Sequence, residues 1–247
     1  MQIALRAEPA RPAGWQAPVP ASVRGATFLI LPAFNEAPVI GGVVSELCAG
    51  YPNVVVVDDG SEDATSERAR DAGAVVLRHA VNRGQGAAIQ TGLEYALREG
   101  ARYLVTFDSD GQHRAEDVAA VLAPITEGRA EIVLGSRFLG DVKGIPWSRR
   151  WLLRPAVVFT RLVSGVRVTD SHNGLRALSR RAASQIHISL DRMAHASEII
   201  DQVKSTGLPY VEVPVHVRYT GYSRAKGQPG RAAITIAFEY LLSRILR

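Results

Sequence analysis

Two aspartates, Asp108 and Asp110, stand one residue apart at the end of an apolar run that closes with Phe107. Mg²⁺ and Mn²⁺ prefer oxygen ligands and commonly bind one or two carboxylates together with substrate phosphates. The pair, with Gln112 and His113 close behind it, therefore predicts a divalent-cation site with room for a diphosphate. An ordinary solvated turn is the alternative interpretation, because Asp-x-Asp triplets are common in such turns.

A second acidic pair, Asp58 and Asp59, ends a run of four valines at residues 54–57. A carboxylate at this place can accept hydrogen bonds from a base N–H or a ribose hydroxyl, so we expect at least one of the two to contact a nucleotide. A helix cap or an Asx turn leading into the next helix is the alternative, above all for Asp59.

The segment Asn82-Arg-Gly-Gln-Gly86 precedes a predicted helix. Free backbone N–H groups and Arg83 near a helix N-terminus form a general anion site. The segment lacks the third glycine of a dinucleotide fingerprint and the lysine of a P-loop. Neither a Rossmann dehydrogenase nor a P-loop NTPase is therefore supported.

Alternating strands and helices must position these segments. Apolar runs predict strands over residues 27–31, 54–57, 74–77, 103–107 and 132–134, and helical spacing predicts helices over 38–50, 87–98 and 116–125 and one ending near 71. This order indicates an α/β fold built on a single Rossmann-like, mostly parallel sheet flanked by helices. Right-handed crossovers place the carboxyl ends of such strands along one edge, where ligands of open α/β sheets bind. We therefore expect residues 35–36, 58–59 and 108–110 to line one crevice.

The pattern changes beyond residue 140. Residues 147–162 are predicted to be helical and carry four arginines. Residues 232–246 are predicted to form an amphipathic helix. Its apolar face is expected to bind an anionic membrane, to pack on the sheet or to lie in a dimer interface. Residues 208–219 alternate, which predicts a strand with valines facing inward and Glu212 among the outward residues. Residues 1–25 are rich in Ala, Pro and Arg and are expected to be a flexible leader, with one domain over 26–247.

Composition limits the class of protein. The 247 residues are 47 % hydrophobic and 21 % charged, which excludes a disordered chain, a collagen-like fibre and a coiled coil. Cys48 is the single cysteine, so no intrachain disulfide forms and a reducing, cytosolic setting is expected. The net charge of +5 suits an anionic partner, but an aromatic content of 6 % argues against a stacking platform for nucleic acid. No signal peptide or spanning segment is visible, so we expect a cytoplasmic protein that is at most peripheral on the inner face of the membrane.

Five motifs together resemble those of family 2 glycosyltransferases, and most of all the branch of dolichyl- or polyprenyl-phosphate sugar synthases. In chain order they are Leu31-Pro-Ala-Phe-Asn-Glu36, Val57-Asp-Asp-Gly-Ser61, Asn82-Arg-Gly-Gln-Gly86, Asp108-Ser-Asp-Gly-Gln-His113 and Gly135-Ser-Arg137. The resemblance covers about residues 26–230. It implies a GT-A fold, a UDP- or GDP-linked sugar donor, Mg²⁺ or Mn²⁺, and inversion at the anomeric carbon.

The resemblance also implies roles on the donor side. Pro32, Phe34, Glu36 and Asp58 would line the nucleotide pocket, Asp108 would lie by the ribose and the metal, and Asp110 and Gln112 would be direct metal ligands. A loop around residues 219–230 would close over the donor diphosphate, with Arg224 and Lys226 neutralising the leaving nucleotide. An ordinary solvated loop is the alternative for that segment.

On the acceptor side, Thr169-Asp-Ser-His-Asn-Gly-Leu-Arg176 matches the family's Asp-x-x-x-Gly-Phe-Arg segment and places Asp170 near the acceptor. Arg137 would face phosphate, unless it makes a surface salt bridge, and Glu198 would share a polar helix face with His195. The branch commonly carries an arginine followed four residues later by a serine, whereas here Leu153 follows Arg149 and Arg154 follows Arg150. Arg149 or Arg150 could replace the missing serine contact, because arginine pairs with phosphate through two hydrogen bonds.

The sequence thus favours transfer of a sugar to a polyprenyl phosphate, with Asp110 and Asp170 as catalytic residues. A sugar hydroxyl on a cell-surface glycan is the alternative acceptor, and Asp170 would then be the base. A non-catalytic partner of a membrane glycosylation complex is an alternative of another class, and a membrane-protein partner or a homodimer is compatible with either. A nucleotidyltransferase would need a glycine-rich diphosphate loop after the first strand, and residues 31–36 are not one.

Overall fold

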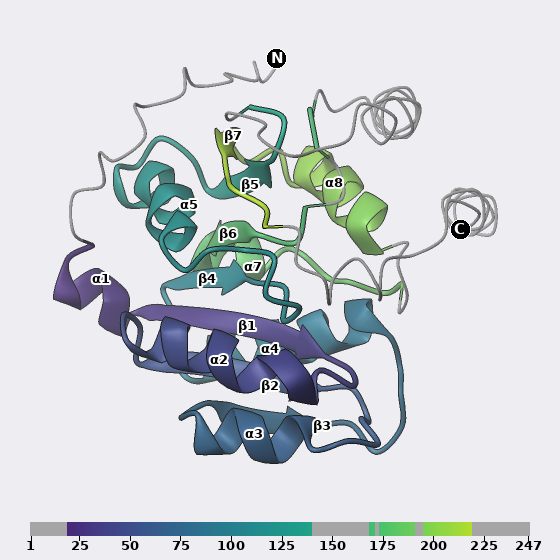
Figure 1. Cartoon of the computed structure of the whole chain (residues 1–247). Helices are drawn as coiled ribbons and strands as arrows, with labels where there is room; N and C mark the ends of the chain where they lie inside the picture. The colour runs from purple at the N-terminus through teal and green to yellow at the C-terminus, as the bar shows by residue number, and fades with distance from the viewer. Residues whose placement is uncertain (1–18, 140–167, 171–172, 191–194, 219–247) are drawn as a thin grey trace.

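The computed structural model describes residues 19–139, 168–170, 173–190 and 195–218. Seven strands in the described residues form one sheet (Figure 1). They are β1 (Thr27–Ala33), β2 (Asn53–Asp58), β3 (Val75–Arg78), β4 (Tyr103–Thr106), β5 (Ile132–Ser136), β6 (Arg176–Ser179) and β7 (Tyr210–Pro214). The helices are α1 (Ala21–Gly25), α2 (Ala37–Cys48), α3 (Thr65–Asp71), α4 (Gln85–Arg98), α5 (Asp117–Thr126), α7 (Arg180–Ala183) and α8 (His195–Thr206).

The strand order is β3-β2-β1-β4-β6-β5-β7. Strands β3, β2, β1 and β4 run parallel, and β5 pairs in parallel with β7. Between these two blocks lies β6, which is antiparallel to both β4 and β5. The expected single, mostly parallel sheet flanked by helices is confirmed, and β6 is the strand that the sequence analysis missed. Its four residues are too few to show either an apolar run or an alternation.

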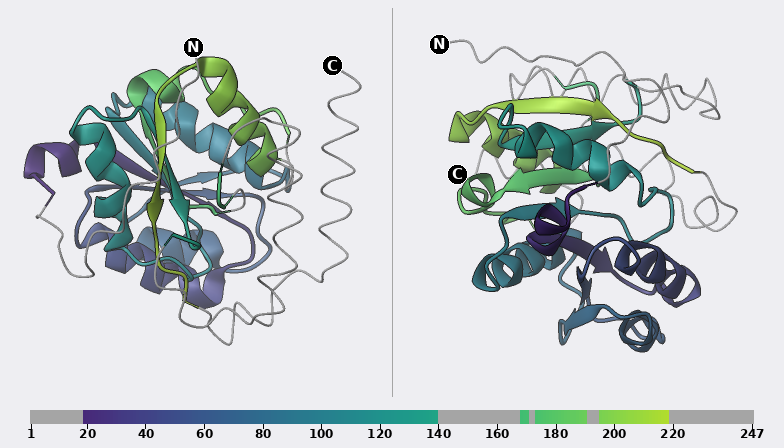
Figure 2. Two further views of the ribbon diagram at one scale, coloured as in Figure 1. Left: turned by 90° about the horizontal axis from the view of Figure 1, so that it is seen from above. Right: turned by 90° about the vertical axis from the view of Figure 1, so that its left-hand side faces the viewer.

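Helices cover both faces of the sheet (Figure 2). On one face α4, α7 and α8 pack against alternate strand residues such as Ile30, Val55 and Leu104. On the other face α2, α3 and α5 pack against the residues between them, such as Leu29 and Val56. Because both faces are covered, the central strands are apolar at nearly every position, which explains their continuous apolar runs. Each fully buried Val, Leu or Ile contributes about 1.5–3 kcal/mol to the stability of this arrangement.

The predicted elements agree with the observed ones to within a few residues up to β5. The predicted strand at 208–219 is shorter in the structure, where β7 ends at Pro214, and Glu212 is not an outward residue. The exposed fraction of Glu212 is 0 %, so the expectation that its side chain faces solvent was wrong. Residues 21–25 of the expected leader form α1, while the predicted helices at 147–162 and 232–246 lie outside the described residues. No helix in the described ranges is both long enough and apolar enough to cross a bilayer.

Candidate functional site

The carboxyl ends of β1, β2, β4 and β5 meet at one edge of the sheet, where the amino end of β6 also begins. The segments that follow these strands therefore lie side by side, as the strand pattern predicts. They bring the two acidic pairs together with Arg137 and with the segment that enters β6. This edge is the candidate active site.

The segment after β1 is fastened to the turn after β2. The amide of Asn35 donates to Ser61 Oγ at 2.9 Å, and its side-chain oxygen accepts from the amide of Glu62 at 2.9 Å. The amide of Glu36 donates to Thr65 Oγ1 at 2.8 Å. Asn35 has a φ of 53°, in the left-handed region that asparagine tolerates better than most residues. These bonds bury Glu36 and leave the ring of Phe34 40 % exposed, where a base could stack on it.

Asp58 is fully buried and holds its own turn. One carboxylate oxygen accepts from the amide of Ser61 at 2.8 Å, and the other accepts from Ser66 Oγ. Both bonds are internal to the β2–α3 connection, so this carboxylate shapes the turn. Its predicted contact with a nucleotide stays a prediction.

Asp59 joins the turn after β2 to the segment before α4. Its carboxylate accepts from the amides of Arg83 at 2.9 Å and Gly84 at 2.6 Å, and it contacts His79 Nδ1 at 2.7 Å. These bonds are structural, but they differ from the helix cap or Asx turn raised as the alternative, because they cross to the segment before α4 instead of leading into α3. The same bonds position Arg83, whose side chain is exposed beside the start of α4.

Replacing Asp59 with alanine is expected to lower the free energy of unfolding by about 2–4 kcal/mol, because each lost hydrogen bond to a carboxylate is worth about 1.5–3 kcal/mol. Urea denaturation of the variant measures the loss. Asp71→Ala, at an exposed aspartate, is the matched control and should change the stability little. Equal midpoints for the two variants would contradict this role of Asp59.

Asp108 lies just beyond β4 and is held from three sides. Its two oxygens contact Gln85 Nε2 and His113 Nε2, each at 3.2 Å. Gly174 lies against the carboxylate, since a Cβ added there would be 2.1 Å from Asp108 Oδ1. The carbonyl of Gly174 accepts from Thr106 Oγ1 at 2.6 Å, which fixes this glycine at the end of β4.

Asp110 lies in the same acidic surroundings. Its pKa is raised to about 6, first by burial and then by the charge of Asp108, with a smaller contribution from Glu36. The amide of Gln112 donates to Asp110 Oδ1 at 3.0 Å and offsets part of this shift. Burial and the neighbouring carboxylates thus both disfavour the ionised form of Asp110 in the described part of the chain.

A divalent cation fits this charge. The described residues contain no group of three or more His, Cys, Asp or Glu side chains that could hold a metal ion. Two carboxylates and an amide nevertheless match the few protein ligands that Mg²⁺ uses when phosphates supply the remainder. Asp108, Asp110 and Gln112 are the residues that would hold the ion.

Arg137, which is partly exposed, and the buried Asp170 form an ion pair at the end of β5. Arg137 Nε donates to Asp170 Oδ2 at 2.6 Å and Arg137 Nη2 donates to Asp170 Oδ1 at 3.0 Å, a two-bonded geometry. Asp170 is 4 % exposed. Both residues were predicted to serve the acceptor, and the structure brings them together as partners of each other.

Glu212 binds the backbone of residues 169 and 170 beside this pair. The sequence analysis did not identify it as a site residue. Its carboxylate accepts from the amide of Thr169 at 2.8 Å and of Asp170 at 3.2 Å. Burial raises the pKa of Glu212, while these hydrogen bonds lower it. Its position on β7 beside β5 is visible only once the sheet order is known.

Glu198 has a different environment from the one expected. Its carboxylate is buried and accepts from the amides of Ser189 at 3.0 Å and Leu190 at 2.8 Å, so it fastens the segment before α8. A role of Glu198 toward the acceptor stays a prediction.

Four further predicted site residues lie outside the described residues: Arg149, Arg150, Arg224 and Lys226.

Comparison with known proteins identifies the family. The sequence model of "Glycosyl transferase family 2" matches residues 28–186, which is more than half of the chain. The chain belongs to glycosyltransferase family 2. It is therefore an enzyme, as the five motifs predict.

Relatives of this glycosyltransferase confirm the resemblance to the polyprenyl-phosphate branch. It is 33 % identical to a UDP-N-acetylglucosamine–dolichyl-phosphate N-acetylglucosaminyltransferase of Methanococcus voltae, over 88 % of this chain and 96 % of the relative. It is also 33 % identical to a polyprenol monophosphomannose synthase of Mycolicibacterium smegmatis, over 87 % of both chains.

A solved structure confirms the GT-A fold. Glucosyl-3-phosphoglycerate synthase of Mycobacterium tuberculosis, in complex with Mn²⁺, UDP-glucose and phosphoglyceric acid, superposes with a TM-score of 0.69. The superposition covers 96 % of this chain and 87 % of that chain at 21 % identity. At that identity the likeness concerns the fold alone.

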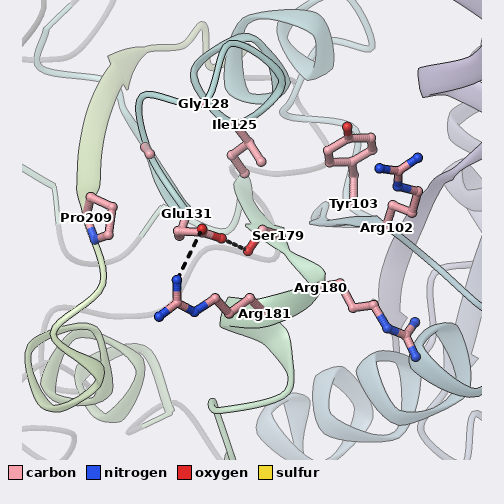
Figure 3. Close-up of a pocket in the computed structure, with 10 residues that line it drawn as sticks. Arg102, Tyr103, Ile125, Gly128, Glu131, Ser179, Arg180, Arg181 and Pro209 are labelled. Carbon is pink, nitrogen blue, oxygen red and sulfur yellow. Dashed lines mark hydrogen bonds and ion pairs between the residues drawn. The ribbon is translucent and has the colours of Figure 1, made fainter.

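A separate cleft of about 280 Å³ lies at the opposite end of the sheet of this glycosyltransferase. Figure 3 shows Glu131 in it, between Ser179 and Arg181. Tyr103, at the start of β4, lines this cleft, whereas Asp108 lies beyond the other end of the same strand. The cleft is thus remote from the candidate active site.

Proposed function

We propose that this glycosyltransferase moves a sugar from a UDP- or GDP-linked donor to a polyprenyl phosphate, with inversion at the anomeric carbon. The observation that carries the proposal is the state of Asp170. Both carboxylate oxygens of Asp170 accept hydrogen bonds from Arg137, and the Asp170 side chain is buried. A carboxylate whose two oxygens both accept from an arginine is not arranged to take a proton from an acceptor hydroxyl, which suits an acceptor that is already anionic.

The donor is expected to bind between β1, β2 and β4. Phe34 offers an exposed ring to the base, and Pro32 and Glu36 lie on the same segment. Arg83, beside the start of α4, supplies positive charge near the diphosphate. Support for a nucleotide-sugar donor also comes from the Methanococcus relative, whose name specifies UDP-N-acetylglucosamine.

Mg²⁺ or Mn²⁺ bound by Asp108, Asp110 and Gln112 would stabilise the charge that develops on the departing nucleoside diphosphate. Gln85 and His113 orient the Asp108 carboxylate, and the amide of Gln112 orients Asp110. The acceptor phosphate attacks from the opposite face of the sugar, where Arg137 and the arginines at 149 and 150 are proposed to hold it.

The names of the relatives support a lipid-phosphate acceptor, since one acts on dolichyl phosphate and another makes polyprenol monophosphomannose. Such an acceptor lies in a membrane, so we propose that the enzyme works at the inner face of the cytoplasmic membrane. Residues 26–247 would act there as one catalytic domain, alone, as a dimer or with a membrane-protein partner. A sugar hydroxyl on a glycan is the second candidate acceptor.

The test is a transfer assay with UDP- and GDP-sugars, Mn²⁺ and either undecaprenyl phosphate or soluble sugar acceptors. We expect product with the lipid phosphate. Loss of a general base lowers the rate by about 10²–10⁴-fold, and we expect Asp170→Asn to lose less activity than that. The wild-type enzyme without Mn²⁺ is the control for metal dependence. Transfer only to the soluble sugars, together with a collapse of activity in Asp170→Asn, would make Asp170 the base and reject the phosphate acceptor.

A further inference from the structure

A buried arginine stands between the two halves of the site. Arg176 is 3 % exposed and is the first residue of β6. Its backbone lies opposite Thr106 of β4 and Leu134 of β5. Asp108 follows Thr106 by two residues, and Arg137 follows Leu134 by three. The antiparallel strand therefore places one cation between the metal-side carboxylates and the Arg137–Asp170 pair.

The charges around Arg176 are opposite to its own. Burial lowers the pKa of Arg176, and the charges of Asp108 and Asp170 raise it, that of Asp108 more strongly. Arginine stays protonated in proteins, so a positive charge persists here. Its Nη1 has no hydrogen-bond partner within the described part of the chain. A buried cation with an unsatisfied donor is unfavourable for folding, which points to a function for its charge.

The balance of charge in the crevice indicates what that function is. Glu36, Asp108, Asp110 and Asp170 are among the carboxylates along the described edge of the sheet, in addition to Asp58 and Asp59. Arg137 donates two hydrogen bonds to Asp170, so part of its charge is offset by that carboxylate. Such an excess of negative charge favours a divalent cation but repels a phosphate group. Arg176 is a buried cation that interacts with both Asp108 and Asp170.

We propose that Arg176 is a positioning residue that offsets the charge of Asp108 and Asp170 and so allows phosphate-bearing ligands to bind beside these carboxylates. This inference rests on the proposed function, which brings phosphate to the site from two sources, the nucleoside diphosphate of the donor and the phosphate of the acceptor. Arg176 acts on them through space, because its guanidinium is buried. The proposal predicts effects of opposite sign on cation and anion binding, which a merely loosened site would not produce.

Calorimetric titration of the full chain tests this with three probes: Mn²⁺ alone, UDP at saturating Mn²⁺, and farnesyl phosphate at saturating Mn²⁺ and UDP. In Arg176→Met we expect Mn²⁺ to bind as tightly as in the wild type or more tightly. At least one phosphate probe should bind about 10–100-fold more weakly, as loss of a nearby charge implies. Weakening of UDP identifies the donor diphosphate as the ligand served by Arg176, and weakening of farnesyl phosphate identifies the acceptor.

The control variants separate charge from folding. Arg176→Lys places an ammonium group beside the same two carboxylates, which favour its charged form, and should restore the phosphate affinities to within about threefold of the wild type. Arg176→Gln removes the charge but keeps a polar side chain, and it replaces the methionine variant if that one does not fold. Arg98→Met, at an exposed arginine of α4, should bind every probe as the wild type does.

Unchanged binding of both phosphate probes would overturn the proposal, and so would equal weakening of Mn²⁺ and the phosphate probes. Failure of the proposed function gives a different result. A wild-type enzyme that binds UDP and Mn²⁺ but transfers no sugar to a lipid phosphate would reject the acceptor and leave the UDP comparison between Arg176→Met and Arg176→Lys decisive.

Discussion

Replacing Gly174 with alanine is expected to reduce kcat/KM by at least about 100-fold, because a displacement of about 1 Å in an active site costs that much. A Cβ at this position would lie 2.1 Å from Asp108 Oδ1 and 2.2 Å from Asp108 Oδ2. No carboxylate oxygen can remain at that distance from a carbon atom, so Asp108 must move. Its contacts with Gln85 and His113 would be lost with the movement.

The glycine is needed for space at this position, since Gly174 is not among the residues with a positive φ. A matched control is Gly42→Ala, in the exposed middle of α2, where an added Cβ meets nothing within 4 Å. That control should keep full activity and gain about 0.5–1 kcal/mol in stability, because alanine is the better helix former. Steady-state kinetics and a Mn²⁺ titration measure both variants. Wild-type Mn²⁺ affinity and activity in Gly174→Ala would mean that the position of Asp108 is not needed.

Replacing Asp110 with asparagine is expected to have two opposite effects. Metal-dependent transfer should fall by at least about 100-fold, because a site with few protein ligands loses one anionic ligand. The metal-free protein should at the same time become more stable at pH 7–8. Burial and the charge of Asp108 raise the pKa of Asp110 from 3.8 to about 6, so its ionised form destabilises the fold.

The sign of the stability change depends on pH. The folded state binds more protons than the unfolded state between the two pKa values, 3.8 and about 6, so the wild-type stability falls as the pH rises through this window. Above it the variant should be more stable by about 1–3 kcal/mol, and below pH 4 the difference should vanish. In the wild type, Mn²⁺ affinity should fall as the pH drops below about 6, because protons compete for Asp110.

Urea denaturation in EDTA at several pH values measures the stability of both proteins, and transfer assays with added Mn²⁺ measure their activity. Asp71→Asn, at an exposed aspartate, is the control and should leave stability and activity nearly unchanged. Near wild-type turnover in Asp110→Asn, still inhibited by EDTA, would show that the metal binds elsewhere. A variant less stable than the wild type at pH 8 would contradict the charge repulsion at Asp110.

Much of the sheet edge that carries the acidic pairs could be predicted from the sequence. The apolar runs at residues 27–31 and 54–57 are strands buried on both faces. Such strands can be recognised from residue types alone, because burial on both faces requires an apolar side chain at nearly every position. Because parallel strands end at the same edge, the acidic pairs at 58–59 and 108–110 had to lie near each other. The five motifs added the family, which the comparison confirmed.

The surroundings of Asp108, Thr169 and Arg176 were decided by the tertiary structure. The insertion of β6 between β4 and β5 brings Gly174 against Asp108, 66 positions earlier in the chain, and carries Arg176 into the core. Pairing of β5 with β7 turns Glu212 toward Thr169, although the alternation of residues 208–219 had indicated an outward side chain. The pattern of residue types along one strand or helix indicates which of its side chains are buried. Which partners a buried charge meets depends on the order of strands in the sheet, and that order follows from packing across the whole domain.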